Sequence, residues 1–392
     1  MRLSDFDVIV VGSGFFGATI AERCAAQLDL KVCVLEKRSH IGGNCYSAVD
    51  DETGIEYHKY GTHIFHTNSE GTWKYINRFS RFTNYQHKVF TIHKGQVFPM
   101  PINLGTICSF FGRYFTPTEA RELVTTQIGP LKTTSHLNLE DKAVSQIGRP
   151  LYEAFIRGYT KKQWDTDPRE LPSEIISRLP VRYSLDDRYF SDRFQGMPED
   201  GYTRIFERMM AHKNITCFLN VDYFDISVLL QPKQLLVYTG PIDRFFDYRY
   251  GLLGWRTIDL EREVAPVSDF QGTSVMNYAD EDVPYTRVHE FKHLHPERAY
   301  KGNSTLVFRE YARFAQEADE AYYPIACRNS KNTYDLYRAE TKKYRNVLFG
   351  GRLGTYRYLD MHQAIGAALK DFDSFVCPFF ETDKPAVSTL GF

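Results

Sequence analysis

The chain has 392 residues and a formal net charge of −1, so it is long enough for two or three domains with buried cores. This balance of charge argues against general binding to nucleic acid, and no block of like charges forms a basic arm. Aromatic residues make up 15% of the chain, and many of its 26 tyrosines stand beside arginine or glycine.

Cysteine usage and apolar runs indicate the compartment. The seven cysteines are scattered and none belongs to a CxxC pair, which is typical of a reduced cytosolic protein. The start of the chain lacks a signal-peptide core, and no segment has eighteen consecutive apolar residues. We therefore expect a cytoplasmic protein without a membrane span.

The first forty residues carry the pattern of a dinucleotide-binding unit. An apolar run at 8–11 leads into GSGFFG at 12–17, and Glu36 closes a second apolar run at 32–35. The first glycine of this motif permits a tight turn, the second admits a pyrophosphate, and the third lets the helix pack on the strand. Glu36 is placed to accept hydrogen bonds from a ribose diol. A purely structural glycine turn is the alternative.

A second glycine turn, IGGN at 41–44, indicates which dinucleotide binds. This extended pattern resembles FAD-binding proteins of the glutathione-reductase type. The apolar strand at 235–238 and the glycine turn at 350–351 agree with it, because in such flavoproteins a C-terminal strand and turn lead into a helix that supports the flavin. The apolar spacing predicts that helix at 360–372, and its N-terminal dipole suits an anion or a polarised carbonyl.

Two further patterns lie between these segments. From Pro101 to about Arg182 helix starts appear, with Pro117 as a first helical residue and helical spacing at 138–148 and 151–159. From about 254 to 323 short alternations of Val, Thr, Tyr and Phe predict an antiparallel sheet.

The predicted fold class is α/β, with three domains. They are a discontinuous Rossmann-like FAD-binding domain (1–85, 195–245 and 330–392), an inserted helical domain (101–182, with a mobile substrate loop near 166–182) and an antiparallel β-sheet domain (86–100, 183–194 and 246–329).

Two arginines and an aromatic pair are candidates for ligand binding. Arg178 follows a proline-containing loop and Arg287 lies in the predicted sheet. The planar guanidinium suits phosphate oxygens, so the two could clamp a diphosphate, although structural salt bridges are the alternative. Phe155 and Tyr159 share one helical face, either as a core pair or as a stacking surface for a base or sugar.

The histidines form two groups in the sequence, at 58–66 and 289–295. Neither group shows the spacing of a known metal site or an obvious carboxylate that completes it, so we expect no bound metal. His63 is expected to be a neutral hydrogen-bonding neighbour of the flavin. An interior polar histidine is the alternative.

Taken together, these segments resemble the bacterial UDP-galactopyranose mutases over essentially the whole chain. The resemblance rests on the glycine motif with GIEYHKYGTHIFHT (54–67), GRPLYEAFIRGYTKKQW (148–164), RLPVRY (178–183), VPYTR (283–287), YYP (322–324) and GGRLGTYRYLDM (350–361). It implies an isomerase that interconverts UDP-galactopyranose and UDP-galactofuranose without net redox change. In that reaction, N5 of the reduced flavin acts as nucleophile on the anomeric carbon.

The resemblance, with the motifs, also implies individual roles. Catalytic roles fall on Arg178, Arg287 and His63. Substrate contacts fall on Phe155, Tyr159, Trp164, Arg178, Tyr189, Asn277, Arg287, Tyr323, Tyr358 and Asp360. Contacts to FAD fall on Gly12, Gly14, Phe16, Gly17, Glu36, Lys37, Gly43, Asn44, His63, Arg352, Tyr358, Asp360 and Met361. The implied partners are UDP-galactose, an external reductant such as NAD(P)H, and a second copy of the chain in a homodimer.

Three other functions remain as alternatives. A flavin oxidoreductase of the amine-oxidase type shares the FAD domain, and fold alone does not exclude it. An NAD-dependent nucleotide-sugar epimerase needs a Tyr-x-x-x-Lys motif, and no tyrosine in the chain has lysine four residues later. A noncatalytic flavin sensor has no need of paired arginines and tyrosines.

Overall fold

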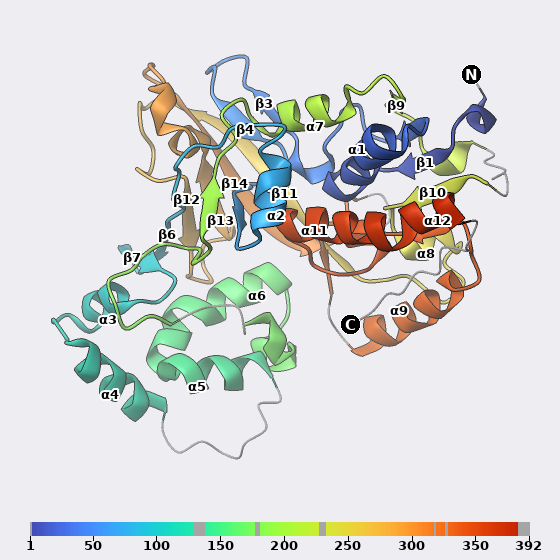
Figure 1. Ribbon diagram of the computed structural model, residues 1–392. Coiled ribbons are helices and arrows are strands. Elements are labelled where there is room, and N and C mark those ends of the chain that lie inside the picture. The colour runs from blue at the N-terminus through green and yellow to red at the C-terminus, as the bar shows by residue number, and fades with distance from the viewer. Residues whose placement is uncertain are drawn as a thin grey trace.

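The structure is a computed structural model that describes residues 2–128, 138–176, 181–226, 233–316, 319–325 and 328–382. Figure 1 shows a helical unit that projects from the rest of the molecule, a long twisted sheet above it, and a second sheet flanked by helices. Arg178 lies outside the described residues.

The N-terminal strand is the middle of a parallel sheet. Within the described ranges the strand order is β16-β10-β1-β2-β9. The strands are β1 (Val8–Val11), β2 (Val32–Leu35), β9 (Ile215–Phe218), β10 (Leu235–Tyr238) and β16 (Val347–Phe349). The predictions of strands at 8–11, 32–35 and 235–238 are confirmed.

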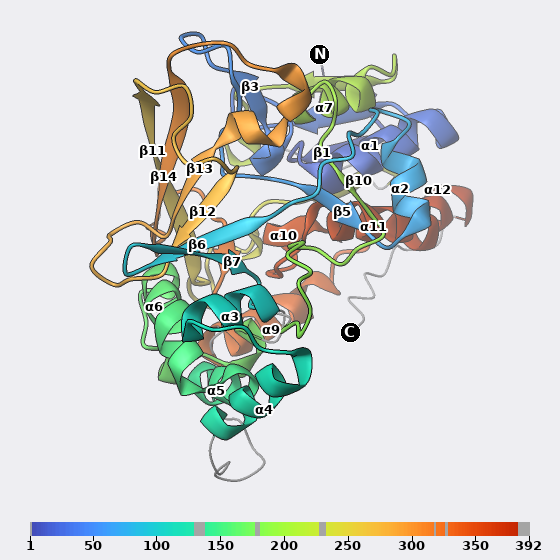
Figure 2. The ribbon, with the colours of Figure 1, turned by 90° about the vertical axis from the view of Figure 1, so that its left-hand side faces the viewer.

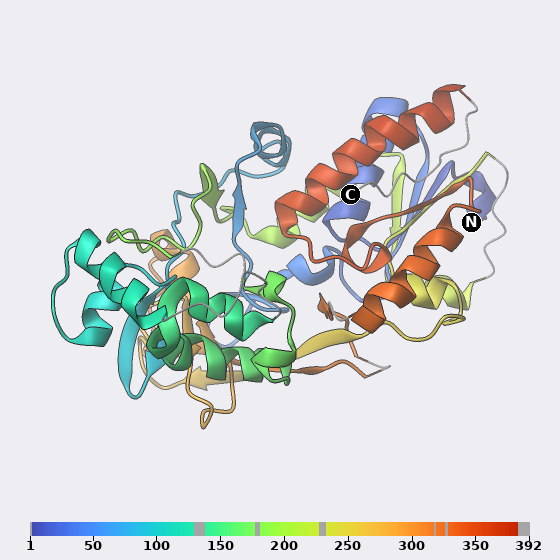
Figure 3. The ribbon, with the colours of Figure 1, turned by 90° about the horizontal axis from the view of Figure 1, so that it is seen from below.

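Helices cover both faces of this sheet. Val8 and Val10 pack into a core that includes α1 (Phe15–Leu28) and α11 (Met361–Asp371). Ile9 points to the opposite core, which includes α8 (Ile242–Phe245) and α9 (Arg328–Thr341). In Figure 3 the red helix α11 and the orange helix α9 flank the strands. Burial on both faces explains why these strands are continuous apolar runs instead of alternating ones.

The second sheet has the order β15-β11-β14-β13-β12-β6-β7. Its strands are β6 (Val89–His93), β7 (Gln96–Met100), β11 (Trp255–Ala265), β12 (Val275–Tyr278), β13 (Arg287–Glu290), β14 (Thr305–Phe314) and β15 (Tyr323–Pro324). The prediction of an antiparallel sheet is confirmed for every strand pair of this sheet but one, because β12 pairs in parallel with β6. The helical unit separates these two strands in the chain, so no tight hairpin imposes opposite directions on them.

The helical unit contains α3 (Leu104–Phe111), α4 (Pro117–Ile128), α5 (Leu139–Leu151), the π-helical turn η3 (Tyr152–Arg157) and α6 (Gly158–Trp164). As predicted, α4 begins at Pro117, and Asn138 caps α5 by accepting a hydrogen bond from the Asp141 amide. The segments predicted as two helices form one path, broken where Gly148 has a φ of 75°. Figure 2 shows β7 beside α3, where the sheet joins this unit.

Short elements connect these parts. They are β3 (Ser47–Val49), β4 (Glu56–His58), β5 (Phe65–Thr67), β8 (Phe194–Gly196), α2 (Glu70–Ile76), α7 (Tyr202–Met210), α10 (Gly351–Gly354) and α12 (Cys377–Thr382). Among the helices of the described ranges, none is long and apolar enough to cross a membrane. The exact domain boundaries stay a prediction.

Candidate functional site

A cleft of about 750 Å³ lies where the two sheets and the helical unit meet. Its volume is within the range of about 300–1,000 Å³ that is usual for small-molecule sites. Apart from Arg178, every predicted site residue except Trp164 lines this cleft. Trp164 packs against the core of the helical unit instead. The cleft therefore brings together segments that are far apart in the sequence.

The glycine motif at the cleft floor is shaped for a bound phosphate group. A Cβ at Gly12 would lie 2.2 Å from Thr239 Oγ1, and one at Gly17 would lie 2.1 Å from the Gly12 carbonyl oxygen, so both positions exclude a side chain. A Cβ at Gly14 would meet nothing within 4 Å. Gly14 also begins α1, whose N-terminal amides favour an anion. The open space at Gly14 fits a pyrophosphate.

Glu36 is buried beside this motif and held in one orientation. Its Oε2 accepts hydrogen bonds from the Ser13 amide at 3.0 Å and from the Ser13 hydroxyl at 2.7 Å, and its Oε1 accepts from the Arg38 amide at 3.0 Å. A carboxylate has about four acceptor sites, so capacity remains for a ribose hydroxyl.

Arg38 is a cleft residue that the sequence analysis missed. Its guanidinium stacks 4.4 Å over the Tyr60 ring and donates to Glu320 at 2.6 Å and to Asn44 at 2.9 Å. Lys37 lies 3.6 Å from the same Glu320 carboxylate. Arg38 lies two residues after Glu36, which the sequence analysis identified. No motif in the sequence distinguishes Arg38 from a surface arginine.

Arg352 is held in the cleft by backbone carbonyl groups. It donates to the carbonyl oxygens of Tyr322 at 2.9 Å and Leu359 at 2.7 Å, and its guanidinium lies 4.8 Å from the Tyr358 ring centre. Tyr358 in turn stacks on Tyr323. Burial raises the pKa of both phenols, so both keep the proton that a hydrogen bond to an anion requires.

Arg287 is the cation that the mixed sheet brings to the cleft. It stands opposite Asn277 in one strand pair and opposite Glu310 in the other, so all three lie in one row across β12, β13 and β14. Its Nε lies 3.2 Å from Glu310 Oε1. Burial alone would raise the pKa of the Glu310 carboxyl, but Arg287 and the hydrogen bond from His289 lower it to about 2.

Glu310 and His289 form a buried support behind Arg287. His289 Nε2 lies 3.1 Å from Glu310 Oε2, and its Nδ1 lies 2.7 Å from the Thr62 hydroxyl. The sequence analysis weighed His289 only as a metal ligand and missed Glu310. No local signal marks Glu310, because its strand also carries two arginines, and its pairing with Arg287 depends on strand register.

Phe155 and Tyr159 lie on consecutive turns. They were predicted to be either a core pair or part of a ligand-binding surface, and both descriptions apply. Phe155 is only 3% exposed and packs edge to face against Phe98 and Phe110, so it belongs to the core, yet it also lines the cleft. The Tyr159 hydroxyl accepts a hydrogen bond from Arg287 Nη2. Burial raises the pKa of Tyr159 to about 12, so its own proton stays available for a ligand.

His63 is a neutral hydrogen-bonding group in the cleft wall. Its Nδ1 lies 2.7 Å from the Gly61 carbonyl oxygen, which can only accept, so Nδ1 carries the proton. Burial lowers the pKa of His63 to about 4. The Nε2 atom is therefore left as an acceptor at neutral pH.

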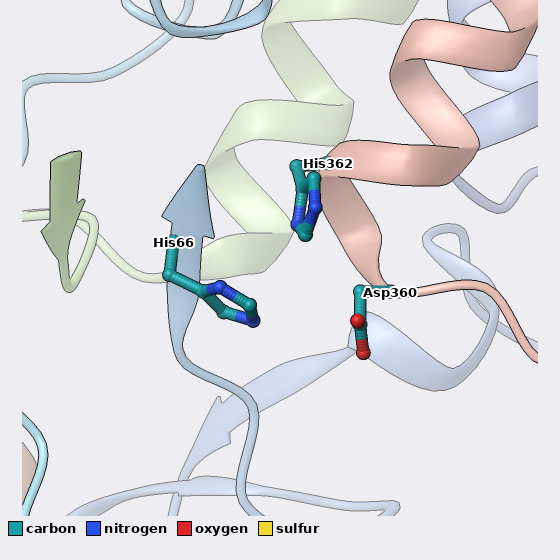
Figure 4. Close-up of side chains that lie close together, drawn as sticks. All are labelled: His66, Asp360 and His362. Carbon is teal, nitrogen blue, oxygen red and sulfur yellow. The ribbon is translucent and has the colours of Figure 1, made fainter. Parts of the chain in front are cut away.

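A second group of titratable side chains lies at the start of α11. Figure 4 shows His66 from β5 facing Asp360 and His362, whose potential ligand atoms all lie within 4.8 Å of one another. The expectation that no carboxylate completes either histidine group is therefore wrong. Folding brings Asp360 beside His66 across almost three hundred residues of sequence, and it brings Asp269 and Glu290 beside His293 in the second group. The absence of a bound metal stays a prediction.

The fold and the site together define a class of protein. The Rossmann-like glycine motif at 12–17 lines the same cleft as the mixed sheet and the helical unit. The sheet and the helical unit supply arginine and aromatic side chains to that cleft. This arrangement is that of α/β flavoproteins that bind a separate substrate.

Comparisons with known proteins identify the family within that class. The sequence pattern of UDP-galactopyranose mutase matches residues 154–358, and that of the NAD(P)-binding Rossmann-like domain matches residues 10–79. The dTDP-fucopyranose mutase of Escherichia coli is 40% identical over 93% of this chain and 96% of its own. The probable UDP-galactopyranose mutase of Klebsiella pneumoniae is 40% identical over 99% of both chains. The chain belongs to the UDP-galactopyranose mutase family, the nucleotide-sugar pyranose–furanose mutases.

Solved structures agree on the fold. A crystal structure of reduced UDP-galactopyranose mutase superposes with a TM-score of 0.70 at 15% identity and covers 94% of this chain and 95% of that one. A putative protoporphyrinogen oxidase from Exiguobacterium superposes with a TM-score of 0.65 at 12% identity, over 94% and 98% of the two chains. Proteins named for different reactions thus share this architecture, so the reaction must be argued from the site.

Proposed function

We propose that this chain binds FAD and interconverts UDP-galactopyranose and UDP-galactofuranose. The observation that carries the proposal is the continuity of the cleft. It runs from the glycine motif, past Arg352 and Tyr358, to Arg287, Phe155 and Tyr159. One cleft can therefore hold a dinucleotide and a nucleotide sugar in contact with each other.

The residues of the cleft support specific tasks. Arg287, supported by Glu310, would bind the diphosphate and stabilise the charge that develops when UDP leaves. The protonated phenols of Tyr323 and Tyr358 would donate to the same oxygens. His63 would orient a donor of the flavin or of the sugar through its free Nε2. When bound and reduced, FAD supplies the nucleophile for the anomeric carbon.

A second candidate substrate is dTDP-fucopyranose. It is supported by the Escherichia coli relative, which is as similar to this chain as the Klebsiella relative is. UDP-galactose is preferred because the neighbouring polar side chains of His66, Asp360 and His362 line the same cleft. These side chains can hydrogen-bond to the C6 hydroxyl of galactose, which a 6-deoxy sugar such as fucose lacks.

The test is turnover by the FAD-loaded enzyme after dithionite reduction, with each nucleotide sugar supplied separately and the furanose product separated chromatographically. A higher kcat/KM for UDP-galactose supports the proposal. Preference for dTDP-fucose would assign the second candidate instead. Stoichiometric consumption of electrons, with no isomer formed, would indicate the oxidoreductase alternative. We also propose an external reductant such as NAD(P)H, a cytoplasmic location and a homodimer, on the strength of the resemblance.

A further inference from the structure

Lys162, on α6, has an unusual set of partners. Its Nζ lies within hydrogen-bond distance of four backbone carbonyl oxygens of one segment, which share its three N–H donors: those of Tyr278 at 2.8 Å, Asp280 at 2.7 Å, Val283 at 3.0 Å and Tyr285 at 3.0 Å. This segment is the turn between β12 and β13, residues 279–286, with its flanking carbonyl at 278. Burial lowers the pKa of Lys162 to about 8, so the ammonium form with three donors still predominates at neutral pH.

The same face of α6 makes two further contacts with this turn. Gly158, Lys161 and Lys162 have the i, i+3 and i+4 spacing that places side chains on one side of a helix. A Cβ at Gly158 would lie 2.3 Å from the Ala279 carbonyl oxygen, so the backbones are already in close contact. Lys161 Nζ lies 2.8 Å from Glu281, but this ion pair is exposed.

The ends of the turn carry two of the cleft residues. Asn277 precedes it on β12 and Arg287 follows it on β13, while Tyr159, which receives the hydrogen bond from Arg287, is three residues before Lys162 on α6. The turn and the helix therefore carry opposite sides of the nucleotide site. The contacts between the turn and α6 therefore set the distance between Arg287 on one side of the site and Tyr159 on the other.

We propose that Lys162 is a positioning residue for the nucleotide part of the substrate, because it ties the turn 279–286 to α6 and so keeps Asn277 and Arg287 in place beside Phe155 and Tyr159. Lys162 is not among the residues that line the cleft, so it acts through these neighbours. The inference rests on the proposed function for the identity of the nucleotide. The arrangement of turn and helix stands on the hydrogen bonds alone.

The test compares Lys162→Met with Lys161→Met in the FAD-loaded enzyme. Methionine keeps the length and apolar volume of lysine but has no donor, and Lys161 is a matched control because exposed ion pairs contribute little. We expect Lys162→Met to raise KM, and the dissociation constant of UDP measured by calorimetry, roughly tenfold, with kcat changed by less than about threefold. Lys161→Met should match the wild type in both.

A second variant and a second measurement separate positioning from general destabilisation. Gly158→Ala should push the turn off the helix and weaken UDP binding in the same way, although it leaves Lys162 untouched. Hydrogen exchange of the amides at 279–286 should accelerate in both variants, while that of the parallel sheet stays unchanged. Wild-type UDP affinity and exchange in Lys162→Met would overturn the proposal. Absence of turnover by the wild type, with UDP binding still dependent on Lys162, would refute the proposed reaction but leave the positioning role intact.

Discussion

Arg287 and Glu310 are direct partners across β13 and β14, with 3.2 Å between Arg287 Nε and Glu310 Oε1. Glu310 is 3% exposed, so its charge is almost removed from water and depends on Arg287 and His289. A buried carboxylate of this kind orients the guanidinium and is itself stabilised by it, so function and stability are coupled at this one pair.

The first prediction concerns Glu310→Gln. The glutamine amide keeps the shape but loses the charge, so Arg287 is left partly unpaired and free to adopt other rotamers. We expect the free energy of unfolding to fall by about 3 kcal/mol, and KM for the nucleotide sugar to rise roughly tenfold or more. Urea denaturation and steady-state kinetics measure both. Glu261→Gln is the control, because Glu261 is an exposed carboxylate on β11. Equal stability of the two variants would contradict the coupling.

The same pair gives a pH dependence of stability with a definite sign. The pKa of Glu310 is about 2 in the folded protein and about 4.3 in an unfolded chain. Its stabilising contribution is therefore complete above the unfolded value and is lost as pH falls from there toward 2. Between pH 5 and 2, Glu310→Gln should lose less stability than the wild type. Parallel curves for the two proteins would show that the pKa of Glu310 is not lowered in the folded protein.

The glycine motif predicts two different outcomes from the same substitution. Gly14 has a φ of −67°, which alanine adopts readily, and its Cβ would enter open cleft. Gly14→Ala should therefore fold normally but lose FAD, measured as the flavin absorbance retained after purification. Gly17→Ala should be unstable even without FAD, because its Cβ would meet the Gly12 carbonyl oxygen. If Gly14→Ala retained full flavin content, the pyrophosphate would not lie at Gly14.

His63 should not titrate in the working range of the enzyme. Its pKa of about 4 lies below the ordinary value because burial disfavours the charged ring, so no rate change between pH 5 and 8 should derive from it. Below the unfolded value of about 6.5 the folded protein resists protonation of His63, which lowers its stability as pH falls toward 4. The pH profile of kcat for the wild type and for His63→Asn measures this. An acid limb near pH 6 that disappears in the variant would contradict it.

The strands of the parallel sheet and the glycine motif at 12–17 could be predicted from the sequence, because the interactions that form them lie within a few residues of one another. A tight turn, a close backbone approach and a helix start each act within a few residues of Gly12, Gly14 and Gly17. The helix at Asp360–Phe372 was predictable for the same reason, and Asp360 caps it by a hydrogen-bonded capping box with Gln363.

The missed residues depend on contacts between distant segments. Glu310 is opposite Arg287 only because of the register between β13 and β14, and β6 is parallel to β12 only because of how the helical unit is inserted. Arg38 binds Glu320 from a segment 282 residues away. No local pattern encodes such pairings.

The final prediction concerns metals. The side chains of His66, Asp360 and His362 resemble a set of metal ligands, because their potential ligand atoms lie within 4.8 Å of one another, but polar side chains this close also form hydrogen-bonded groups without a metal. His66 Nδ1 is also engaged by Asp192 at 2.7 Å, which suits a hydrogen-bonded imidazole as well as a ligand. We therefore expect dialysis against a chelator to leave turnover and melting temperature unchanged. The His362→Ala variant, measured with and without added zinc, is the control for adventitious binding. A loss of activity on chelation that a divalent cation restores in the wild type, but not in His362→Ala, would establish a metal site and contradict this prediction.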